Sequence, residues 1–365
     1  MRIAVVTESF LPQVNGVTGS VLRVVEHLAR RGHEAVVVAP GRGPAEHDGV
    51  RVVRVASAPL PLYAEQRVAY PTWELSRALR DFRPDLVHLA APAVLGAQAA
   101  PLARRLGVPA VAVYQTDLPG YAARYGLTGL TRAAWRWVRR VHGMAARTLA
   151  PSRAACEQLR DHGVDRVSRW PRGVDLQRFS PGHRDEDLRR RLAGRGEVLV
   201  GYVGRLAPEK ELGLLAAVQS LPGVRLVVVG DGPARAQLQR LLPRARFLGM
   251  LGGTDLSAAF ASLDLFVHTG RAETFCQAAQ ESLASGVPVV APAAGGLLDL
   301  VEPGVNGTLF APGSAGDLRH HVAALAGDPV RRAQLAGAAR ASVAGRDWAS
   351  VGDDLLATYR EVLAG

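Results

Sequence analysis

Short runs of apolar residues, rich in Val, Ile and Ala, recur along the first half of the chain and predict buried β-strands. They lie at residues 1–9, 34–40, 85–91 and 108–115, and helical patterns at 21–32 and 94–107 separate them. Apolar and polar positions do not alternate within these runs, which is typical of parallel strands covered on both faces. The first half therefore predicts a doubly wound α/β domain.

The same alternation of strand and helix restarts after residues 170–182, WPRGVDLQRFSPG, whose Pro and Gly residues indicate a linker. Further apolar runs lie at 197–205, 224–232, 245–250, 263–270 and 287–293. The last stretch, 347–365, reads as an amphipathic helix that begins after Asp347 and can pack on either domain. We predict an N-terminal domain over 1–170, a C-terminal domain over 171–346 and a C-terminal helix over 347–365.

The predicted fold class is α/β, with two doubly wound Rossmann-like domains facing a central cleft. Ligands of such sheets lie beyond the carboxyl ends of the strands. The 365 residues contain 48% hydrophobic side chains, enough for two sizeable cores, which excludes a disordered chain. Cys156 and Cys276 are far apart and show neither a disulfide framework nor metal-ligand spacing, as expected in a reducing cytosol. The first apolar run ends at Glu8, too short for a signal peptide, and no run is long enough to span a membrane.

Positive charge is concentrated in the first half of the chain. Residues 1–180 carry 25 basic and 14 acidic residues, whereas the remainder carries 19 of each. A basic half favours an anionic partner such as lipid headgroups or nucleic acid, although arginine enrichment on a solvated surface explains it too. The stretch TRAAWRWVRRVHGMAART, 131–148, combines Trp135 and Trp137 with arginines and is typical of a helix lying on anionic lipid. Since these tryptophans point to different faces, one of them can equally be a core residue.

The stretch GRLAPEKE, residues 204–211, contains the only lysine of the chain, Lys210. It follows a predicted strand, so we expect Arg205 at the strand end and Lys210 in the first turn of the next helix. A compact ammonium group beside an arginine and free helix N–H groups suits a diphosphate. The alternative is a solvated helix start.

Glu273 and Glu281 stand eight positions apart in the stretch GRAETFCQAAQES that follows another predicted strand. On one helix the two carboxylates would share a face and lie about 12 Å apart along the axis. Such spacing suits one carboxylate for sugar hydroxyls and one for ribose hydroxyls, with the N–H groups of Phe275 and Cys276 facing phosphate between them. Either glutamate alone would read as an exposed residue of an amphipathic helix.

Two other motifs predict structure rather than chemistry. Gly230-Asp231-Gly232-Pro233 only partly matches a dinucleotide fingerprint, because Arg235 stands where the third glycine belongs, so we predict strand-to-helix packing. Asp185-Glu186-Asp187 reads as a charged helix start rather than a metal site.

The order GRLAPEK, VVVGDGP and E-x7-E resembles that of the GT-B glycosyltransferases of the retaining family 4, and the resemblance covers the whole chain. The stretches TESFLPQVNGVTGSV, VAVYQTDLPGYAARYG, RGVDLQRFSP and HTGRAETFCQAAQESLASG are similar to actinobacterial GDP-mannose-dependent α-mannosyltransferases that act on glycolipids. The resemblance implies transfer of mannose from GDP-mannose, with retention, to a hydroxyl of a phosphatidylinositol mannoside or glycosyl diacylglycerol. It also implies a metal-independent reaction without a cofactor, in an enzyme that is cytoplasmic or peripheral on the inner face of the plasma membrane.

The resemblance also implies roles for particular positions. Arg205 and Lys210 would hold the donor diphosphate, Glu281 the ribose, and Glu273 with the N–H groups of Phe275 and Cys276 the transferred sugar. Gly16, in the loop after the first strand, would let the backbone approach the distal phosphate, unless it is a plain turn glycine. The remaining donor-binding positions are Met250 and Leu251, near the base, and Thr274 and Gln277.

One departure from the family pattern concerns the loop after the fourth strand of the first half, where many members place a histidine near the sugar. Here the loop reads Tyr114-Gln115-Thr116-Asp117. Asp117 is a catalytic candidate that could bind a sugar hydroxyl or stabilise positive charge at the anomeric carbon, or it is a turn aspartate before Pro119.

Three other functions remain open at this stage. One is transfer from a UDP-sugar (glucose, N-acetylglucosamine or sulfoquinovose) by the same fold, and another is a nucleotide-sugar epimerase or phosphorylase. A nucleic-acid binder is disfavoured, because the sequence shows no helix-turn-helix or aromatic stacking motif and E-x7-E would be unexplained.

Overall fold

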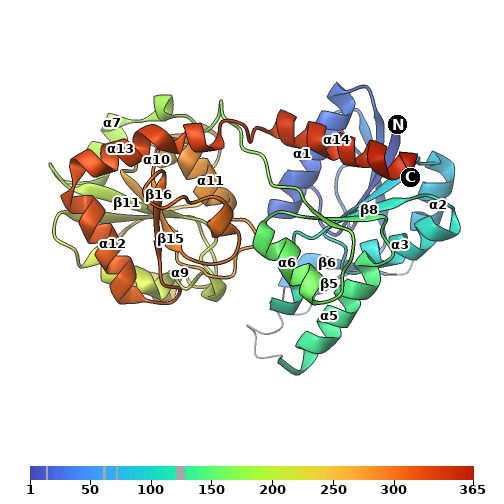
Figure 1. The fold of residues 1–365 in the computed structure, drawn as a ribbon, viewed down its shortest axis with the longest axis horizontal. Coiled ribbons are helices and arrows are strands. Elements are labelled where there is room, and N and C mark those ends of the chain that lie inside the picture. Colours follow the sequence, from blue (N-terminus) through green and yellow to red (C-terminus); the bar gives the residue numbers. More distant parts are fainter. Residues whose placement is uncertain (14, 61–62, 71–72, 121–127) are drawn as a thin grey trace. The chain divides into compact units, whose positions relative to one another are not determined.

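The computed structural model describes residues 1–13, 15–60, 63–70, 73–120 and 128–365. Part of the stretch quoted above for the family resemblance, residues 121–126, therefore lies outside the described residues. The chain forms two compact units: unit 1 comprises Met1–Arg172 and Trp348–Gly365, and unit 2 comprises Gly173–Asp347. These divisions lie close to the boundaries predicted at 170 and 346 (Figure 1).

Unit 1 is built on an eight-stranded sheet with the order β10-β9-β8-β7-β1-β2-β4-β3. All neighbouring pairs are parallel except β3 and β4. A separate antiparallel pair, β5 and β6, completes its strands. Their bounds are β1 Arg2–Thr7, β2 Glu34–Pro40, β3 Glu46–His47, β4 Val50–Val55, β5 Ser57–Leu60, β6 Tyr63–Ala69, β7 Leu86–Ala90, β8 Ala110–Val113, β9 Arg147–Ala150 and β10 Val167–Arg169.

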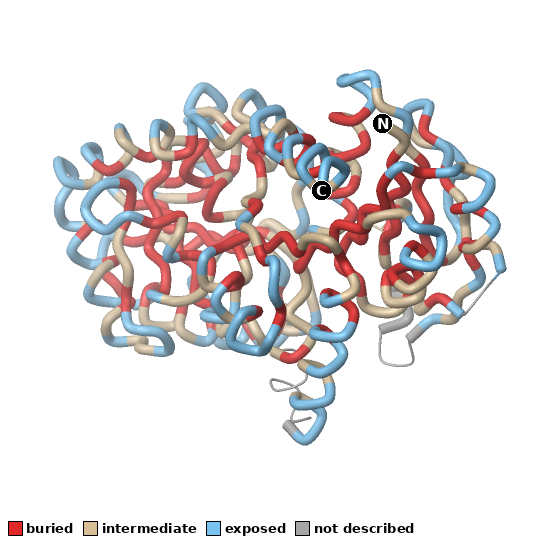
Figure 2. The backbone as a smooth tube through the Cα atoms, turned by 45° about the vertical axis from the view of Figure 1, so that its right-hand side comes forward, coloured by how far each residue is buried: buried red, intermediate tan, exposed pale blue. Residues whose placement is uncertain are grey.

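Alternate residues of β1 enter two different cores, which explains why the strand is apolar throughout. Ile3 and Val5 pack in one cluster with α1 and α14, whereas Ala4 and Val6 pack in another with α2 and α3. Figure 2 shows the buried residues, in red, gathered in the interior of each unit. The described helices of unit 1 are α1 Gly16–Arg30, α2 Trp73–Phe82, α3 Leu95–Arg105, α5 Thr128–His142, α6 Arg153–Asp161 and α14 Trp348–Ala364.

The C-terminal helix α14 belongs to unit 1, where it lies beside α1 (Figure 1). Several contacts hold it there. Tyr359 Oη lies 2.6 Å from His88 Nδ1, Trp170 Nε1 donates to Val351 O at 2.9 Å, and Asp353 pairs with His27 at 2.9 Å. The chain therefore returns to its N-terminal sheet at its end.

Glu8, just after β1, provides the acceptors at the start of α3. Its Oε1 accepts from the N–H groups of Ala93, Val94 and Gly96 at 2.8 to 2.9 Å, and its Oε2 accepts from Leu95 N at 3.1 Å. The first N–H groups of a helix have no partner within it, and Val94 provides no side-chain cap. A carboxylate from a neighbouring strand fills this role, and its charge complements the helix dipole.

We expect Glu8→Ala to destabilise unit 1 by about 2–3 kcal/mol, because hydrogen bonds to a charged group contribute more than neutral ones. The melting temperature should then fall by roughly 4–10 °C. Differential scanning calorimetry of the full chain would measure this. The matched control is Glu157→Ala, an exposed carboxylate on α6, for which an equal fall would show that the capping contacts of Glu8 are not responsible.

Unit 2 is built on a six-stranded parallel sheet with the order β13-β12-β11-β14-β15-β16. Its strands are β11 Val198–Val203, β12 Val224–Val229, β13 Arg246–Gly249, β14 Leu265–Val267, β15 Val289–Pro292 and β16 Gly307–Phe310. The α-helices are α7 Glu186–Leu192, α8 Ala216–Gln219, α9 Arg235–Leu241, α10 Gly253–Ala261, α11 Gln277–Ala284, α12 Ala315–Gly327 and α13 Pro329–Ala339. Short 3-10 helices are η1 Pro181–His183, η2 Pro208–Lys210, η3 Leu212–Leu215, η4 Gly295–Asp299 and η5 Ala341–Val343.

The Gly-Asp-Gly-Pro motif after β12 has a packing role. Gly230 has φ +126°, and a Cβ atom there would lie 2.0 Å from Gly204 O. Gly232 has φ +156°, and a Cβ atom would lie 2.4 Å from Leu206 O. The motif therefore packs directly on the GRLA loop, not only on the helix that follows it. In the acidic run at 185–187, Asp185 is the N-cap of α7, and its side chain accepts a hydrogen bond from Leu188 N.

Candidate functional site

The strand order of unit 2 reverses between β11 and β14. From β11 the chain continues to β12 and β13 on one side of the sheet, whereas β15 and β16 follow β14 on the other. In open parallel sheets the loops that leave two such strands diverge and form the usual ligand site at their carboxyl ends. The two loops here are 204–211 and 268–276, and these contain the motifs that the sequence singled out.

Lys210 and Glu273 come from these two loops and form an ion pair. Lys210 Nζ donates to Glu273 Oε1 at 2.5 Å, and the Lys and Glu side chains are 24% and 15% exposed. A second contact joins the loops, since Thr269 Oγ1 donates to Lys210 O at 2.6 Å. Gly270 permits this approach, because a Cβ atom there would lie 3.1 Å from Lys210 Cα. Two residues that are distant in sequence are thus brought together at the switch point.

The prediction that Lys210 lies in the first turn of the next helix is wrong in one respect, because that turn is a 3-10 turn that does not continue into a longer helix. Lys210 ends the three-residue 3-10 helix η2, and the next residue, Glu211, has φ +51°. A left-handed residue interrupts the helix, so η3 and α8 follow as separate short elements. The ammonium group is therefore held by its ion pair rather than by the geometry of a continuing helix.

The prediction that Glu273 and Glu281 share one helix is also wrong. Helix α11 begins at Gln277, so it contains Glu281 but not Glu273. Its N-cap residue, Cys276, has φ +79°, which breaks the helical path before Glu273. The backbone of 273–275 instead packs on Gly295 and Gly296, where a Cβ atom would lie 2.4 Å from Glu273 O or 2.5 Å from Phe275 Cα.

Neighbouring cations keep Glu273 ionised. Burial acts to raise the pKa of this carboxyl, but the charge of Lys210 and the hydrogen bond and charge of His268 outweigh burial and lower the pKa to about 2. The carboxylate is therefore a fixed negative charge between two cations, and this local environment orients the ammonium group of Lys210.

His268 is a site residue that the sequence reasoning missed. Its ring is 3% exposed, its Nε2 lies 3.0 Å from Glu273 Oε1, and it stacks on Tyr202 with ring centroids 6.0 Å apart. Burial acts to lower the pKa of His268, but the sulfur of Cys276 and the carboxylate of Glu273 favour the protonated ring and raise the pKa to about 10. A histidine directly after the apolar run LDLFV was the available signal, since a polar residue at a strand end points to the ligand edge of a sheet.

Arg205 lies in the same loop as Lys210 and is more exposed. Its side chain is 45% exposed, and its guanidinium lies 3.9 Å from Glu209 Oε1. The Glu209 side chain is 8% exposed, and its Oε2 has no hydrogen-bond partner within the described part of the chain. The loop therefore presents one half-exposed guanidinium next to a largely buried carboxylate.

The remaining predicted donor residues of unit 2 lie at the start of α11 and after β13. Phe275 and Cys276 are buried, Thr274 is half-buried, and Gln277 Nε2 donates to Gly173 O at 3.0 Å. Met250 is 78% exposed directly after β13, and Leu251 is partly buried. Glu281 is half-buried on α11.

In unit 1, Gly16 is the first residue of α1, whose N-cap is Asn15. The guanidinium of Arg172 donates to Gly16 O, and a Cβ atom at Gly16 would lie 3.1 Å from Arg172 Nη1. The absence of a side chain at Gly16 thus leaves room for the guanidinium of Arg172 at the N-terminus of α1. The sequence analysis did not single out this arginine.

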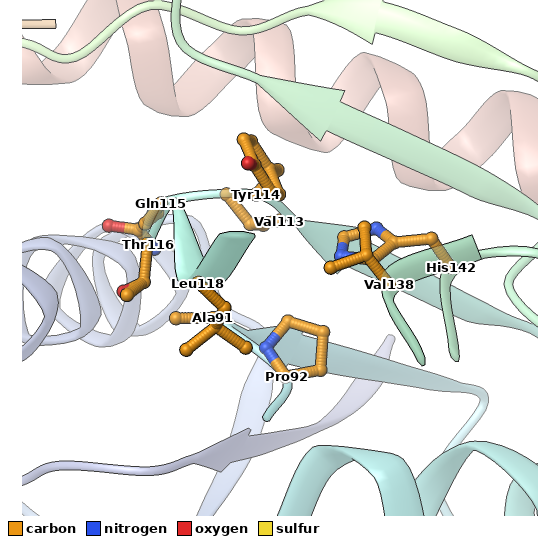
Figure 3. Close-up of a pocket in the computed structure, with 9 residues that line it drawn as sticks. All are labelled: Ala91, Pro92, Val113, Tyr114, Gln115, Thr116, Leu118, Val138 and His142. Atoms are coloured by element: carbon orange, nitrogen blue, oxygen red, sulfur yellow. The ribbon is translucent and has the colours of Figure 1, made fainter. Parts of the chain in front are cut away.

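Asp117 has the turn role that was the alternative to catalysis. Its Oδ1 accepts from Tyr114 Oη at 3.0 Å and from Gly120 N at 2.9 Å. Gln115 differs, because both polar atoms of its side chain are buried and lack a hydrogen-bond partner among the described residues. Figure 3 shows Gln115 and Thr116 on one side of a small pocket and His142 on the other.

The first part of the tryptophan- and arginine-rich stretch, residues 131–142, lies in α5, and its two tryptophans differ as expected. Trp135 is half-buried and stacks on His162 with ring centroids 3.6 Å apart. Trp137 is 42% exposed, and its Nε1 donates to Ala93 O at 2.8 Å. The exposed arginines of the helix are Arg132, Arg136, Arg139 and Arg140.

The protein has two doubly wound domains, and the loops at the switch point of one of them contain a Lys–Glu pair and an arginine. These features are typical of nucleotide-binding α/β enzymes. The model of Glycosyltransferase Family 4 matches residues 14–178, and the model of Glycosyl transferases group 1 matches residues 183–342. The chain belongs to glycosyltransferase family 4, which confirms the predicted family and enzyme class.

Two curated relatives and one solved structure illustrate the similarity. A GDP-mannose-dependent alpha-mannosyltransferase of Mycobacterium tuberculosis is 52% identical over 369 residues, covering 99% of this chain and 97% of the relative. Sulfoquinovosyl transferase SQD2 of Arabidopsis thaliana is 35% identical over 364 residues, covering 95% of this chain and 71% of the relative. The structure of Anabaena HepE in complex with UDP has a TM-score of 0.82 at 23% identity, covering 99% of this chain and 100% of HepE. The predicted GT-B fold of two Rossmann-like domains is confirmed.

Proposed function

We propose that the protein transfers mannose from GDP-mannose to a hydroxyl group of a lipid-linked acceptor, with retention at the anomeric carbon. The donor is supported by the mycobacterial relative, which is named a GDP-mannose-dependent alpha-mannosyltransferase and is 52% identical over nearly the full chain. The acceptor would be of the phosphatidylinositol mannoside or glycosyl diacylglycerol type.

The observation that carries the chemistry is the Lys210–Glu273 pair at the switch point of unit 2. When the bond between sugar and phosphate breaks, positive charge develops at the sugar and negative charge develops on the diphosphate. Preorganised cations that face the developing negative charge stabilise this transition state. We assign this role to Lys210 and Arg205, and the departing phosphate oxygen would accept the acceptor's proton. No metal or cofactor is part of this proposal.

The other donor contacts are assigned by position. Glu273 and the N–H groups at the start of α11, over Thr274 to Gln277, would bind the transferred sugar, and Glu281 would bind the ribose. Met250 and Leu251 would lie against the base, and Gly16 would lie near the distal phosphate. Asp117 would act through the turn that it stabilises, so we place it as a positioning residue rather than a catalytic one.

The lipid acceptor is supported by the surface of unit 1. Helix α5 exposes four arginines and Trp137, a combination that favours an anionic lipid surface. Among the described helices, none is both long and apolar enough to cross a bilayer. We propose a peripheral position on the inner face of the plasma membrane, with no nucleic acid as partner.

The test is transfer of radiolabelled sugar from GDP-mannose, UDP-glucose or UDP-N-acetylglucosamine, supplied separately, into the organic-extractable fraction of actinobacterial membranes. Label from GDP-mannose alone in the lipid fraction is the expected result. Label from a UDP-sugar would overturn the donor assignment but keep the mechanism, an outcome in keeping with the UDP bound to HepE. Label that stays in water-soluble products would overturn the lipid acceptor, and conversion of the donor without an acceptor would indicate an epimerase.

A further inference from the structure

Three potential metal ligands of different chemistry meet in unit 2. One ligand atom each of His268, Glu273 and Cys276 lie within 4.8 Å of one another. His268 and Cys276 are buried, and the Glu273 side chain is 15% exposed. The function proposed above uses the carboxylate of Glu273 to orient Lys210 and bind the sugar, but it assigns no role to the thiol of Cys276.

The imidazole of His268 is directed into the cluster. Its side chain is 3% exposed, and its Nε2 lies 3.0 Å from Glu273 Oε1. The ring is thus the ion-pair partner of the Glu273 carboxylate, so a metal ion that binds here has to displace the ring proton that faces the cluster.

Cys276 has an unusual backbone conformation for its residue type. Its φ of +79° is one that glycine adopts readily and that other residues adopt at a cost of roughly 1 kcal/mol or more. Cysteine at such a position places a sulfur next to the histidine and the glutamate. Strained residues of this kind concentrate at functional sites.

We propose that His268, Glu273 and Cys276 form an inhibitory binding site for one thiophilic divalent cation of the Zn²⁺ class. One thiolate, one imidazole and one carboxylate are ligands that Zn²⁺ and Cd²⁺ accept, whereas Mg²⁺ and Ca²⁺ take oxygen ligands. Tetrahedral zinc with bonds of about 2.0–2.3 Å separates its ligand atoms by about 3.3–3.8 Å. The cluster therefore needs to contract by no more than about 1.5 Å.

Metal binding at this cluster competes with Lys210. The cation would take the Glu273 oxygen that lies 2.5 Å from Lys210 Nζ, and its charge would repel the ammonium group. Two protons are released to solvent, that of the Cys276 thiol when the metal–sulfur bond forms and that of the His268 ring nitrogen when the metal–nitrogen bond forms. Inhibition by the metal rests on the proposed function, because it assumes that Lys210 and Glu273 bind the donor. Metal binding itself does not depend on that function.

The binding test uses Cd²⁺ alone as the probe, added to the full chain, with the ultraviolet charge-transfer band of a cadmium–thiolate bond as the readout. Wild type and the control Cys156→Ser should show the band with one Cd²⁺ per chain, whereas Cys276→Ser should lack it. His268→Phe should weaken Cd²⁺ binding by more than about 100-fold, since the loss of an outer-shell partner already costs about 10- to 100-fold. His268→Gln, which keeps a polar side chain, covers the case in which the phenylalanine variant does not fold.

The proposal is overturned if the wild type shows no band, if the band persists in Cys276→Ser, or if both His268 variants bind Cd²⁺ as the wild type does. In the transfer assay, Zn²⁺ should inhibit and a chelator should restore activity. Undiminished transfer at Zn²⁺ concentrations that saturate the site would overturn the inhibitory role. Absence of transfer in the metal-free wild type would instead count against the proposed function, with the Cd²⁺ band unaffected.

Discussion

Replacing Lys210 by alanine should lower kcat by about 100- to 1,000-fold, the usual cost of removing one preorganised donor from a developing negative charge. The reason is the placement of Lys210 at the switch point of unit 2, where its ammonium group is oriented by Glu273 at 2.5 Å. KM for the donor should change less than kcat, because the interaction strengthens as the diphosphate leaves. Initial rates at saturating donor would measure the effect.

Two further variants make this result interpretable. Arg190→Ala removes a 72% exposed cation that pairs with Asp187 on α7, and it should leave kcat unchanged. Lys210→Arg preserves the charge in a larger planar group, and activity close to wild type would show that the chain's single lysine is an accident of composition. Wild-type turnover in Lys210→Ala itself would remove the diphosphate assignment.

The apolar patterns were informative for the fold because each central strand is buried on both faces. In β11, for example, Leu199 and Val203 enter one core whereas Val200 and Tyr202 enter another, so the whole strand had to be apolar. Seven of the described strands were not predicted. β3, β5, β9, β10 and β16 have four residues or fewer, and β4 and β6 interrupt their apolar residues with charged or polar ones. Sequence periodicity therefore detects strands within longer apolar runs and misses short or interrupted ones.

The site was predicted in its residues but not in its geometry. The stretch from Gly270 to Gln280 contains no proline, and nothing in it signals the left-handed backbone at Cys276. Because of that residue α11 begins only at Gln277, so the helix does not include Glu273. The residues just before Cys276 pack against Gly295 and Gly296, which are distant in sequence, so this local path could not be read from the stretch alone. The role of His268 was hidden for the same reason, because only the fold places its ring against Glu273 and Cys276.

The second large effect concerns Glu273, for which we expect Glu273→Gln to lower kcat by at least about 100-fold. Glutamine keeps the size of the side chain but removes the negative charge between Lys210 and His268. The ammonium group would then lose the partner that orients it, and the transferred sugar would lose a carboxylate acceptor. Single-turnover kinetics with saturating donor would measure the chemical step, with the exposed Glu302→Gln as the control that should behave as wild type.

The double variant Lys210→Ala with Glu273→Gln tests whether the two residues act as one unit. Because the ion pair is broken in either single variant, the second substitution has little left to remove, and the losses should not multiply. We expect kcat of the double variant to lie near that of the slower single variant, which corresponds to a coupling of about 3 kcal/mol, the smaller of the two single losses. If the two losses multiplied instead, Lys210 and Glu273 would act independently on the transition state, and the ion pair would not be what orients the ammonium group.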